Sequence, residues 1–180
     1  VLPCRRRVRK AELRRELGGQ MTMTYTCNYS SPAGEILLAA NDNGLTGLWF
    51  YGAKYFAADL EDERTEKLTP VLRQTLRWLD IYFSGSEPDF MPPLELHGSD
   101  FRRRVWAELA KIPYGETVTY GEIAKKLGVK SAQAVGGAVG HNPVSIIVPC
   151  HRVLGADGSL TGYAGGTDKK ARLLELERGK

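Results

Sequence analysis

The alternation of apolar and polar residues predicts a small β-sheet near the beginning of the chain. Three short runs rich in Thr, Tyr, Ile, Leu and Trp are separated by SPAG at 31–34 and by DNG at 42–44. Gly, Pro, Asn and Asp at such positions favour tight turns between paired strands. We therefore predict an antiparallel three-stranded meander over residues 24–30, 35–41 and 45–52.

A helix and a proline-rich connection are predicted after the sheet. Residues 54–68 are polar without a strong period, and we predict nothing more stable than a short helix there. Residues 70–85 repeat apolar side chains at helical spacing and end in glycine, which indicates an amphipathic helix. The segment 87–98 contains three prolines, as is typical of a linker. We assign residues 23–90 to an N-terminal α/β domain and residues 91–98 to the linker.

Residues 99–178 are predicted to form a second domain, which is mostly helical. Ser99 is a favourable N-cap for a helix that ends before Pro113. Thr119 opens a capping box for a second helix, which ends at Gly128. The whole pattern predicts an α+β fold, in which a small antiparallel sheet with one helix precedes a helical domain.

The third helix of this domain is short and has only small side chains. Ser131 caps the run AQAVGGAVG, which extends to residue 140. Two helices joined by a glycine-containing turn of about three residues form a helix-turn-helix pattern. Small residues allow close packing on another helix, or close approach of the backbone to a DNA groove. Residues 144–149 predict a buried strand or extended run, and the last helix is predicted to begin near Thr167.

Charge is divided unevenly along the chain. Residues 1–20 carry a net charge of +5, residues 21–100 carry −7, and residues 101–180 carry +6. The basic C-terminal part indicates either a face for a polyanion or an ordinary solvated surface. The first 22 residues lack the apolar core of a secretory signal. We predict that 1–22 is a disordered or wrongly assigned basic extension, with a nucleic-acid-binding arm as the alternative.

Cysteine usage and motifs limit the classes of protein that fit. Cys4, Cys27 and Cys150 are scattered and form neither a disulfide framework nor a zinc pattern. A reducing cytoplasm is therefore the expected compartment. The apolar runs are too short for a membrane helix, and no phosphate loop or dinucleotide motif is present. We expect no metal, no cofactor and no membrane partner.

The run IIVPCHRV places a thiol between a proline and a histidine. A buried cysteine is most often only a small apolar residue. A neighbouring base or cation, however, lowers the pKa of a thiol and makes it nucleophilic. His151 can reach the sulfur of Cys150 only if the chain turns there or a water bridges them, because successive residues of a strand point in opposite directions. Pro149 favours such a turn.

Several separated motifs resemble one known family. VPCHRV, GHNP eight residues upstream, TGYAGG downstream and the final LLELE resemble the O6-alkylguanine-DNA alkyltransferases, also called methylated-DNA–protein-cysteine methyltransferases. SPAGEILLAANDNGLTGLWF is similar to the first domain of that family, so the resemblance covers roughly residues 23–178. It implies a ribonuclease H-like N-terminal domain and a winged helix-turn-helix-like C-terminal domain.

The resemblance also implies a reaction and roles for named residues. Cys150 would accept the alkyl group from O6-alkylguanine, or from O4-alkylthymine, in one irreversible transfer. His151 would remove the thiol proton through a water, and Glu177 would orient His151. Tyr120 would protonate the departing guanine, and Asn142 would brace the turn beside the active-site segment. Backbone carbonyls of Cys150 and Val153 would read the guanine amino group, and the pocket would be formed by Tyr163, Val139 and Ala164.

The implied partner is double-stranded DNA, bound by a monomer through the minor groove, with the damaged base flipped out. The DNA contacts would come from the second helix of the helix-turn-helix and its surroundings, at Ser131, Gln133, Ala134 and Tyr120. Gln133 departs from the family, which commonly has arginine there to fill the vacated space. Glutamine is uncharged and shorter, so we predict weaker DNA binding and flipping with unchanged thiol chemistry.

Three rival interpretations remain open on the residues alone. A non-catalytic binder of alkylated DNA would replace the acceptor cysteine, which is present. A transcription regulator would need polar base-reading side chains on its second helix. A cysteine hydrolase would use the Cys–His pair for many turnovers. Each proposed site residue also has a plain structural role, such as a core aromatic for Tyr163 or an exposed helix acid for Glu177.

Overall fold

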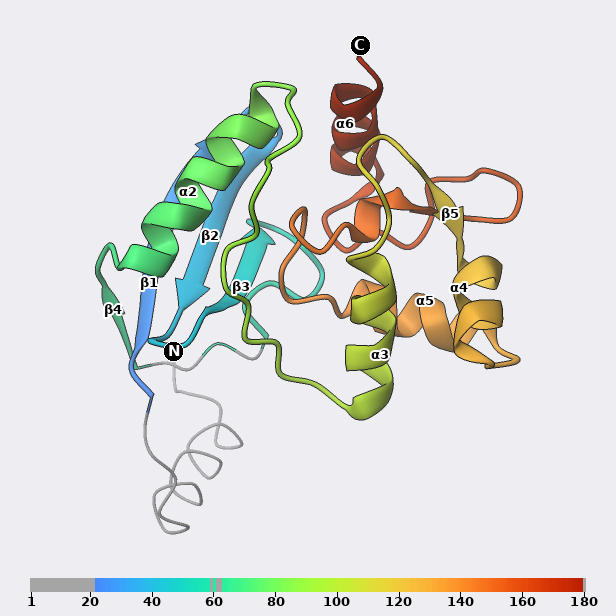
Figure 1. Cartoon of the computed structure of the whole chain (residues 1–180), viewed down its shortest axis with the longest axis horizontal. Coiled ribbons are helices and arrows are strands. Elements are labelled where there is room, and N and C mark those ends of the chain that lie inside the picture. Colours follow the sequence, from blue (N-terminus) through green and yellow to red (C-terminus); the bar gives the residue numbers. More distant parts are fainter. Residues whose placement is uncertain (1–21, 59, 61–62, 180) are drawn as a thin grey trace, which may run out of the picture.

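The computed structural model of this 180-residue protein describes residues 22–58, 60 and 63–179. The predicted basic extension 1–22 lies outside these residues except for its last position. A sheet with helix α2 lies beside a group of helices formed by the C-terminal half (Figure 1). The sheet elements and their helix are β1 (Thr24–Ser31), β2 (Gly34–Ala40), β3 (Leu45–Phe50), β4 (Arg64–Glu66) and α2 (Pro70–Phe83).

The sheet has the strand order β3-β2-β1-β4. Strands β1, β2 and β3 pair antiparallel, which confirms the predicted meander. Strand β4 pairs parallel to β1, so the sheet is mixed and not purely antiparallel. No strand was predicted here, because the three residues of β4 are all polar and exposed. Its stability comes from hydrogen bonds to the edge of β1 and not from an apolar pattern.

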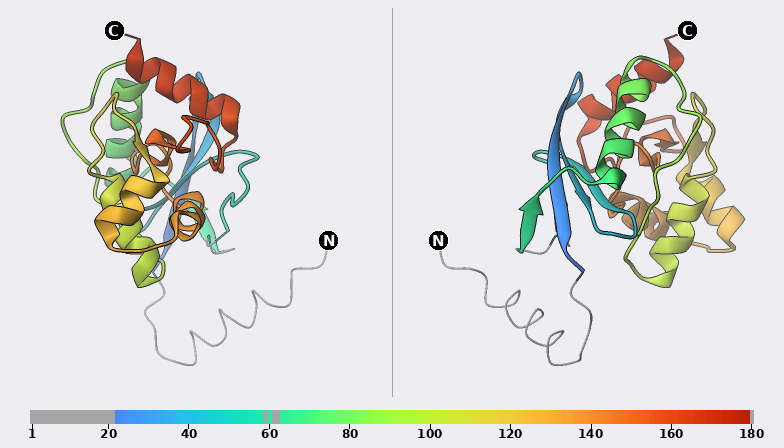
Figure 2. Two further views of the ribbon diagram at one scale, coloured as in Figure 1. Left: turned by 90° about the vertical axis from the view of Figure 1, so that its right-hand side faces the viewer. Right: turned by 60° about the vertical axis from the view of Figure 1, so that its left-hand side comes forward.

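The two faces of the sheet are covered by different parts of the chain. Alternate residues of a strand point to opposite faces, and Ile36, Leu38 and Phe50 share one apolar core with α2 and the C-terminal helices. Helix α2 crosses this face (Figures 1 and 2). On the other face, Leu37 and Trp49 pack in a smaller cluster with residues of the segment that follows β3. The two halves of the molecule are therefore joined through a continuous core.

The outer edge of β3 is completed by two other segments. The Leu45 N–H donates to the Pro93 carbonyl at 2.7 Å, and the Glu95 N–H donates back to the Leu45 carbonyl at 2.9 Å. Further along β3, Leu48 donates to Pro143 at 2.8 Å and accepts from Ser145 at 3.0 Å. The predicted linker is thus fixed to the sheet, and the C-terminal half adds to the same edge.

The C-terminal half is mostly helical, as predicted. Its helices are α3 (Asp100–Leu109), α4 (Tyr120–Leu127), α5 (Ala132–Gly140) and α6 (Thr167–Arg178). The capping box of Thr119 with Glu122 is present, and the Ser131 hydroxyl accepts from the Ala134 N–H at 3.1 Å. Gly128 ends α4 in the left-handed conformation that glycine adopts readily. A short parallel ladder joins β5 (Val118–Thr119) to β6 (Val153–Leu154).

The strand predicted over residues 144–149 is wrong. This segment is a series of turns in which Val144 alone forms an isolated bridge, to Leu48. Ile146 has a φ of 69°, which is unusual for a β-branched residue. The Asn142 side chain holds the turn, donating to the Val148 carbonyl at 2.7 Å and accepting from the Val144 N–H at 3.0 Å. These side-chain bonds replace those of a ladder.

Candidate active site

Cys150 opens a single turn of 3-10 helix, Cys150–Arg152 (η1), directly after Pro149. The residue is buried, with 4 % of its surface exposed, and it belongs to the core cluster shared by both halves. The chain therefore turns at Cys150, which is the condition under which the following imidazole can share a site with the sulfur. The stretch of turns held by Asn142 leads directly to this position.

The environment of the thiol contains opposing influences. Burial raises the pKa of the Cys150 thiol above its ordinary 9.0, while the Asn142 amide, the Lys170 charge and Ser145 lower it. Burial is the largest of these effects, because a thiolate loses its hydration there. The resting sulfur therefore keeps its proton, and a nucleophilic reaction at this position needs a base.

His151 is the base nearest to Cys150 in the sequence. Its hydrogen-bond partners determine which ring nitrogen carries the hydrogen. Its Nε2 atom lies 2.6 Å from Oε1 of Glu177, and both side chains are fully buried. The neutral imidazole donates its Nε2 hydrogen to this carboxylate, so Nδ1 carries the free lone pair. Nδ1 is buried and has no hydrogen-bond partner among the residues that the structure describes. Burial lowers the pKa of His151 more than Glu177 raises it, which keeps the ring neutral and able to accept a proton.

Glu177 is held by donors from several elements. Arg152 donates through Nε to Oε2 at 2.9 Å and through Nη2 to Oε1 at 3.1 Å. The Gly115 N–H donates at 3.1 Å, and the Tyr82 hydroxyl donates at 2.7 Å. Burial by itself would raise the pKa of Glu177, but the hydrogen bonds from His151 and Arg152 outweigh it and bring the pKa to about 2. The carboxylate is therefore ionised at neutral pH.

The predicted pocket residues occupy two kinds of position. Tyr163 and Ala164 line a hollow of about 250 Å³ together with glycines of α5 and with Lys54 and Tyr55 from the N-terminal half. Val139 and Val153 are buried and do not line it. The hollow lies between the two halves of the chain, because the Lys54 N–H donates to the Ala164 carbonyl at 3.0 Å.

Tyr120 does not line the hollow but lies next to two glycines that do, Gly136 and Gly162. Its hydroxyl donates to the Thr161 carbonyl at 2.8 Å. Burial, and then the charge of the Cys150 thiolate, raise the pKa of Tyr120 above its ordinary 10.0. The hydroxyl therefore keeps its proton at neutral pH. Gly162 follows Thr161 with a φ of 84°, and a Cβ there would lie 2.4 Å from the Tyr120 hydroxyl oxygen, so this close approach requires glycine.

The residues predicted to contact DNA gather at the exposed beginning of α5. Ser131, Gln133 and Ala134 are all exposed. The same region carries exposed cations on α4 and on the turn after it, at Lys125, Lys126 and Lys130. The arginines of α3 are partly engaged within the fold, since one pairs with Asp100 and another donates to the Leu127 carbonyl.

Three buried residues of the network were not identified from the sequence as site residues. Tyr82 falls within the apolar pattern of residues 70–85, and Arg152 falls within the run IIVPCHRV without a predicted role. Lys170 is fully buried, and its ammonium donates to the carbonyls of Val153 and Thr161. A signal for Lys170 exists, because it is a charged residue at helical spacing with the buried leucines of α6.

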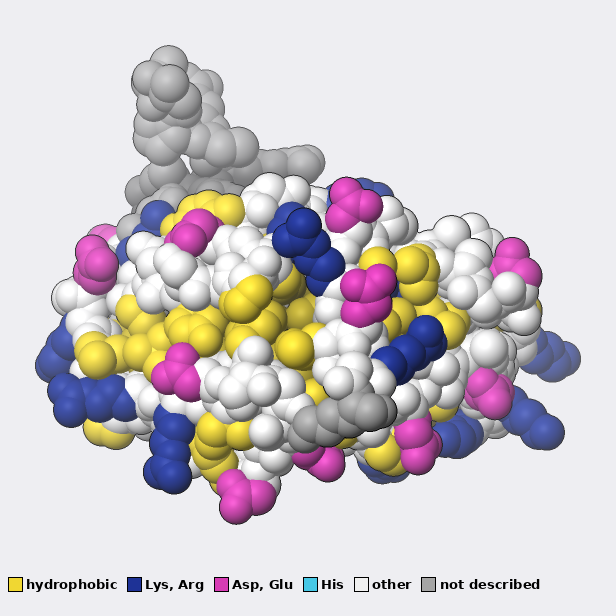
Figure 3. All heavy atoms as spheres, turned by 90° about the horizontal axis from the view of Figure 1, so that it is seen from above, with side chains coloured by type: hydrophobic (Ala, Val, Ile, Leu, Met, Phe, Trp, Pro, Cys, Tyr) yellow, Lys and Arg dark blue, Asp and Glu magenta, His cyan; other side chains and the backbone are white. Residues whose placement is uncertain are grey.

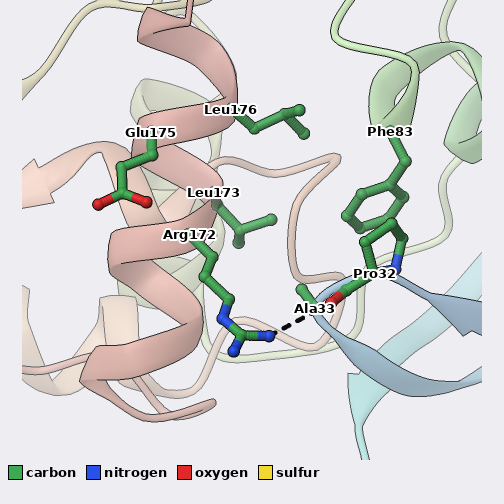
Figure 4. A pocket seen from close by; sticks show the side chains of 7 residues that line it. All are labelled: Pro32, Ala33, Phe83, Arg172, Leu173, Glu175 and Leu176. Atoms are coloured by element: carbon green, nitrogen blue, oxygen red, sulfur yellow. Dashed lines mark hydrogen bonds between the residues drawn. The ribbon is translucent and has the colours of Figure 1, made fainter.

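A second hollow, of about 400 Å³, lies apart from this network. It is bounded by the β1–β2 turn, the end of α2 and the last helix (Figure 4). Arg172 crosses it and donates to the Pro32 carbonyl at 3.3 Å. The face seen from above carries a band of hydrophobic side chains, with Lys and Arg mostly toward its margins (Figure 3). Cys150, His151 and Glu177 are not among the residues that line this hollow, and we assign no chemistry to it.

Two further features concern binding in general. Within residues 22–58, 60 and 63–179, no helix is long and apolar enough to cross a membrane. In the same residues, no group of three or more His, Cys, Asp or Glu side chains is placed to hold a metal ion. In the Cys–His–Glu arrangement, a buried thiol is followed directly in the chain by a neutral base that a carboxylate holds.

Comparison with known families divides the chain into two parts. Residues 100–179 match the family described as 6-O-methylguanine DNA methyltransferase, DNA binding domain. Residues 23–96 match the family described as 6-O-methylguanine DNA methyltransferase, ribonuclease-like domain. Together these matches cover nearly all of the described residues.

Individual proteins show the same similarity over most of their length. A methylated-DNA–protein-cysteine methyltransferase of Mycolicibacterium paratuberculosis is 48 % identical over 151 residues, covering 82 % of this chain and 88 % of that protein. One from Methanosarcina acetivorans is 46 % identical, covering 85 % and 97 %. The crystal structure of a Mycobacterium tuberculosis O6-methylguanine methyltransferase aligns with a TM-score of 0.78 at 43 % identity, covering 87 % and 94 %. A DNA complex of the enzyme from that organism aligns with a TM-score of 0.77, covering 87 % and 93 %.

Proposed function

This chain belongs to the 6-O-methylguanine DNA methyltransferase family, whose reaction is DNA repair by direct alkyl transfer to a protein cysteine, and we propose that Cys150 is the acceptor. One observation carries this proposal above the others. The buried thiol is followed directly by an imidazole whose Nε2 is held by Glu177 and whose Nδ1 has no partner within the described part of the chain. A fixed, neutral base beside a protonated thiol is what nucleophilic activation requires.

The proposed reaction uses these groups in sequence. His151 Nδ1 takes the thiol proton through a bridging water, and Glu177 stabilises the imidazolium that results. The thiolate of Cys150 attacks the alkyl carbon, a carbon–sulfur bond forms, and the bond from that carbon to the guanine O6 breaks. The electron pair leaves with guanine, which Tyr120 protonates; the phenolate then takes a proton from solvent while the imidazolium releases one, so that the thiol proton balances the one given to guanine. The thioether is stable and no group here hydrolyses it, so each molecule reacts once.

The substrate is proposed to be O6-alkylguanine, and also O4-alkylthymine, in double-stranded DNA. The alkyl group lies within the base stack, so the base must leave the duplex to reach a buried sulfur. Tyr163 and Ala164 line the hollow that would receive it, and Val139 is buried without lining it. The carbonyls of Cys150 and Val153 would accept from the guanine amino group, and Asn142 would brace the segment between them and α5.

The DNA surface is proposed to be the exposed beginning of α5. Ser131, Gln133 and Ala134 are accessible there, Tyr120 lies close by, and exposed lysines on α4 supply positive charge for the phosphates. The DNA complex of the Mycobacterium tuberculosis relative supports DNA as the partner. We further propose that the protein acts as a monomer in the cytoplasm, where a reducing environment keeps Cys150 as a thiol.

Intact mass spectrometry tests the proposed function directly. After incubation with a duplex that contains one O6-methylguanine, we expect a gain of one methyl group per protein molecule and no further gain with excess DNA. The Cys150→Ala variant should show no gain, while Cys27→Ala should behave as the wild type. Repeated turnover, or a gain that persists in Cys150→Ala, would contradict the proposal and favour a hydrolase or another acceptor.

Gln133→Arg separates binding of DNA from chemistry at the thiol. Arginine adds a charge and stacking area at the exposed beginning of α5, so transfer from duplex O6-methylguanine should be faster by about tenfold at low protein concentration. The rate with free O6-benzylguanine should not change, because that substrate needs no flipping. Both rates are measured by quenched time courses, with Gln133→Ala as the control. An unchanged duplex rate in Gln133→Arg would contradict the prediction.

A further inference from the structure

Tyr82 is the point at which the N-terminal half reaches the proposed catalytic network. It lies on α2, is fully buried, and donates its hydroxyl to Oε1 of Glu177 at 2.7 Å. The Tyr82 hydroxyl oxygen also lies 3.4 Å from Nε2 of His151. Residues 82 and 177 are 95 positions apart and come from different halves of the chain. The contact therefore exists only when the two halves are docked.

The hydroxyl of Tyr82 shares an acceptor with the proposed base. Oε1 of Glu177 receives His151 Nε2, the Tyr82 hydroxyl and one Arg152 nitrogen. Oε2 receives a second Arg152 nitrogen and the Gly115 N–H. A carboxylate offers about four lone-pair sites, so these five donors compete for them. Each donor withdraws negative charge from the carboxylate and leaves less for the imidazolium.

The position of the Tyr82 ring is fixed by packing and not by its hydroxyl. The ring stacks on Trp78 with centroids 5.3 Å apart, and it meets Phe83 and Tyr114 edge to face. Phenylalanine at this position keeps all of these contacts. Burial and the charge of Glu177 raise the pKa of Tyr82, so its hydroxyl acts only as a donor. Removing the hydroxyl therefore removes one hydrogen bond and little else.

We propose that Tyr82 is a positioning residue through which the N-terminal domain limits the basicity of Glu177 and so keeps His151 neutral. The inference rests on the proposed function, since it assigns His151 the part of proton acceptor. Without the hydroxyl, Glu177 stabilises the imidazolium more strongly, and His151 holds a proton up to a higher pH. A protonated His151 cannot accept the thiol proton, so transfer is lost at a higher pH than in the wild type.

The pH dependence involves every charged or titratable group that faces this pair. Arg152 and Lys170 lower the proton affinity of His151, and Glu177 raises it. Tyr114 lies across from Tyr82, and the Arg152 guanidinium lies 5.6 Å from the Tyr114 ring centre. Cys150, Tyr120 and Tyr163 titrate on the basic side, because burial raises the pKa of each. The acid side of the profile therefore reports His151.

The test compares Tyr82→Phe with the matched control Tyr114→Phe, because the Tyr114 hydroxyl is buried and no described residue forms a hydrogen bond with it. Rates with free O6-benzylguanine are measured from about pH 4.5 to 9, which avoids effects on DNA binding. For Tyr82→Phe we expect the acid midpoint to rise by about half a pH unit or more, with the rate at pH 8 within about twofold of the wild type. Tyr114→Phe should leave the midpoint in place.

A second measurement follows the His151 ring itself by NMR titration in the same three proteins. This titration does not require alkyl transfer. If the wild type does not accept alkyl groups, the proposed function is overturned, and the titration still decides whether Tyr82 affects His151. A uniform loss of rate with an unmoved midpoint, and an unmoved ring titration, would overturn the inference. If Tyr82→Phe does not fold, 3-fluorotyrosine at position 82, a stronger donor, should lower the midpoint; an unmoved or raised midpoint would overturn it.

Discussion

Replacing Glu177 by glutamine should slow alkyl transfer by at least about a hundredfold and destabilise the fold by about 3 kcal/mol. The substitution keeps the shape of the side chain but removes the charge that faces two buried partners, His151 and Arg152. The guanidinium is then left buried without a counter-ion. The carboxamide also places a donor nitrogen against groups that are themselves donors, so the orientation of the imidazole is lost.

The stability effect of Glu177 has a defined pH window. The pKa of Glu177 in the folded protein is about 2, below its ordinary 4.5. A lowered carboxyl pKa stabilises the folded state above the unfolded pKa, and this contribution is lost as the pH falls from about 4.5 toward 2. Urea unfolding between pH 7 and pH 3 should show this loss in the wild type and not in Glu177→Gln. Glu175→Gln, exposed on the same helix, is the control, and equal stabilities of the two variants at pH 7 would contradict the prediction.

Lys170→Met should lower the rate of transfer by about tenfold or more. It should change the free energy of unfolding only slightly. The ammonium donates to the carbonyls of Val153 and Thr161, and Thr161 also accepts from Tyr120. Its charge lowers the pKa of the Cys150 thiol. Methionine fills the space but cannot donate to the two carbonyls, so the pocket wall loses hydrogen bonds. It also removes the positive charge that lowers the thiol pKa, so the Cys150 thiolate is less stable.

The small effect of Lys170→Met on stability follows from opposing terms. The Val153 carbonyl loses its donor while the Thr161 carbonyl still accepts from Tyr120, so the lost hydrogen bonding costs about 1–3 kcal/mol, but the wild type also bears the cost of a buried cation. Burial lowers the pKa of Lys170 from 10.5 to about 8, which is a penalty of about 3 kcal/mol below pH 8. This penalty is relieved as the pH rises from 8 to 10.5, so the wild type should gain stability there and the variant should not. The exposed Lys111→Met serves as the control in both assays, and an unchanged transfer rate in Lys170→Met would refute its role.

Local signals predicted most helices and the meander correctly. Thr119 with Glu122, and Ser131, are recognisable because a cap and its partner lie within one turn of each other. Strand β4 has no such signal, since Arg64, Thr65 and Glu66 are polar and gain their structure from pairing with β1. The apolar run before Cys150 gave the opposite error, because it predicted a strand where the structure has turns. Its residues favour a strand by type, but side-chain bonds from Asn142 decide the conformation.

The candidate site was predictable only in part. The spacing around Cys150 and the family motifs identified the thiol, the imidazole and the acid on α6. Tyr82 escaped because its apolar neighbours at helical spacing give it the pattern of a core residue, and nothing local shows that its hydroxyl meets Glu177. Lys170 escaped because a lysine is normally exposed. Such contacts depend on how elements far apart in the chain pack together. A short stretch of sequence contains no signal for that packing.

The shared edge of β3 links the integrity of the sheet to the reactive segment. A fragment that ended at residue 90 would leave the main-chain groups of Leu45 and Leu48 bare, and a bare strand invites pairing with another copy and aggregation. In the whole protein, the same residues that close this edge, 143–145, begin the path to Cys150. Loss of the hydrogen bonds between these residues and β3 would therefore displace Cys150, which lies only a few residues away. A change that separates this edge of the sheet is expected to reduce alkyl transfer as well.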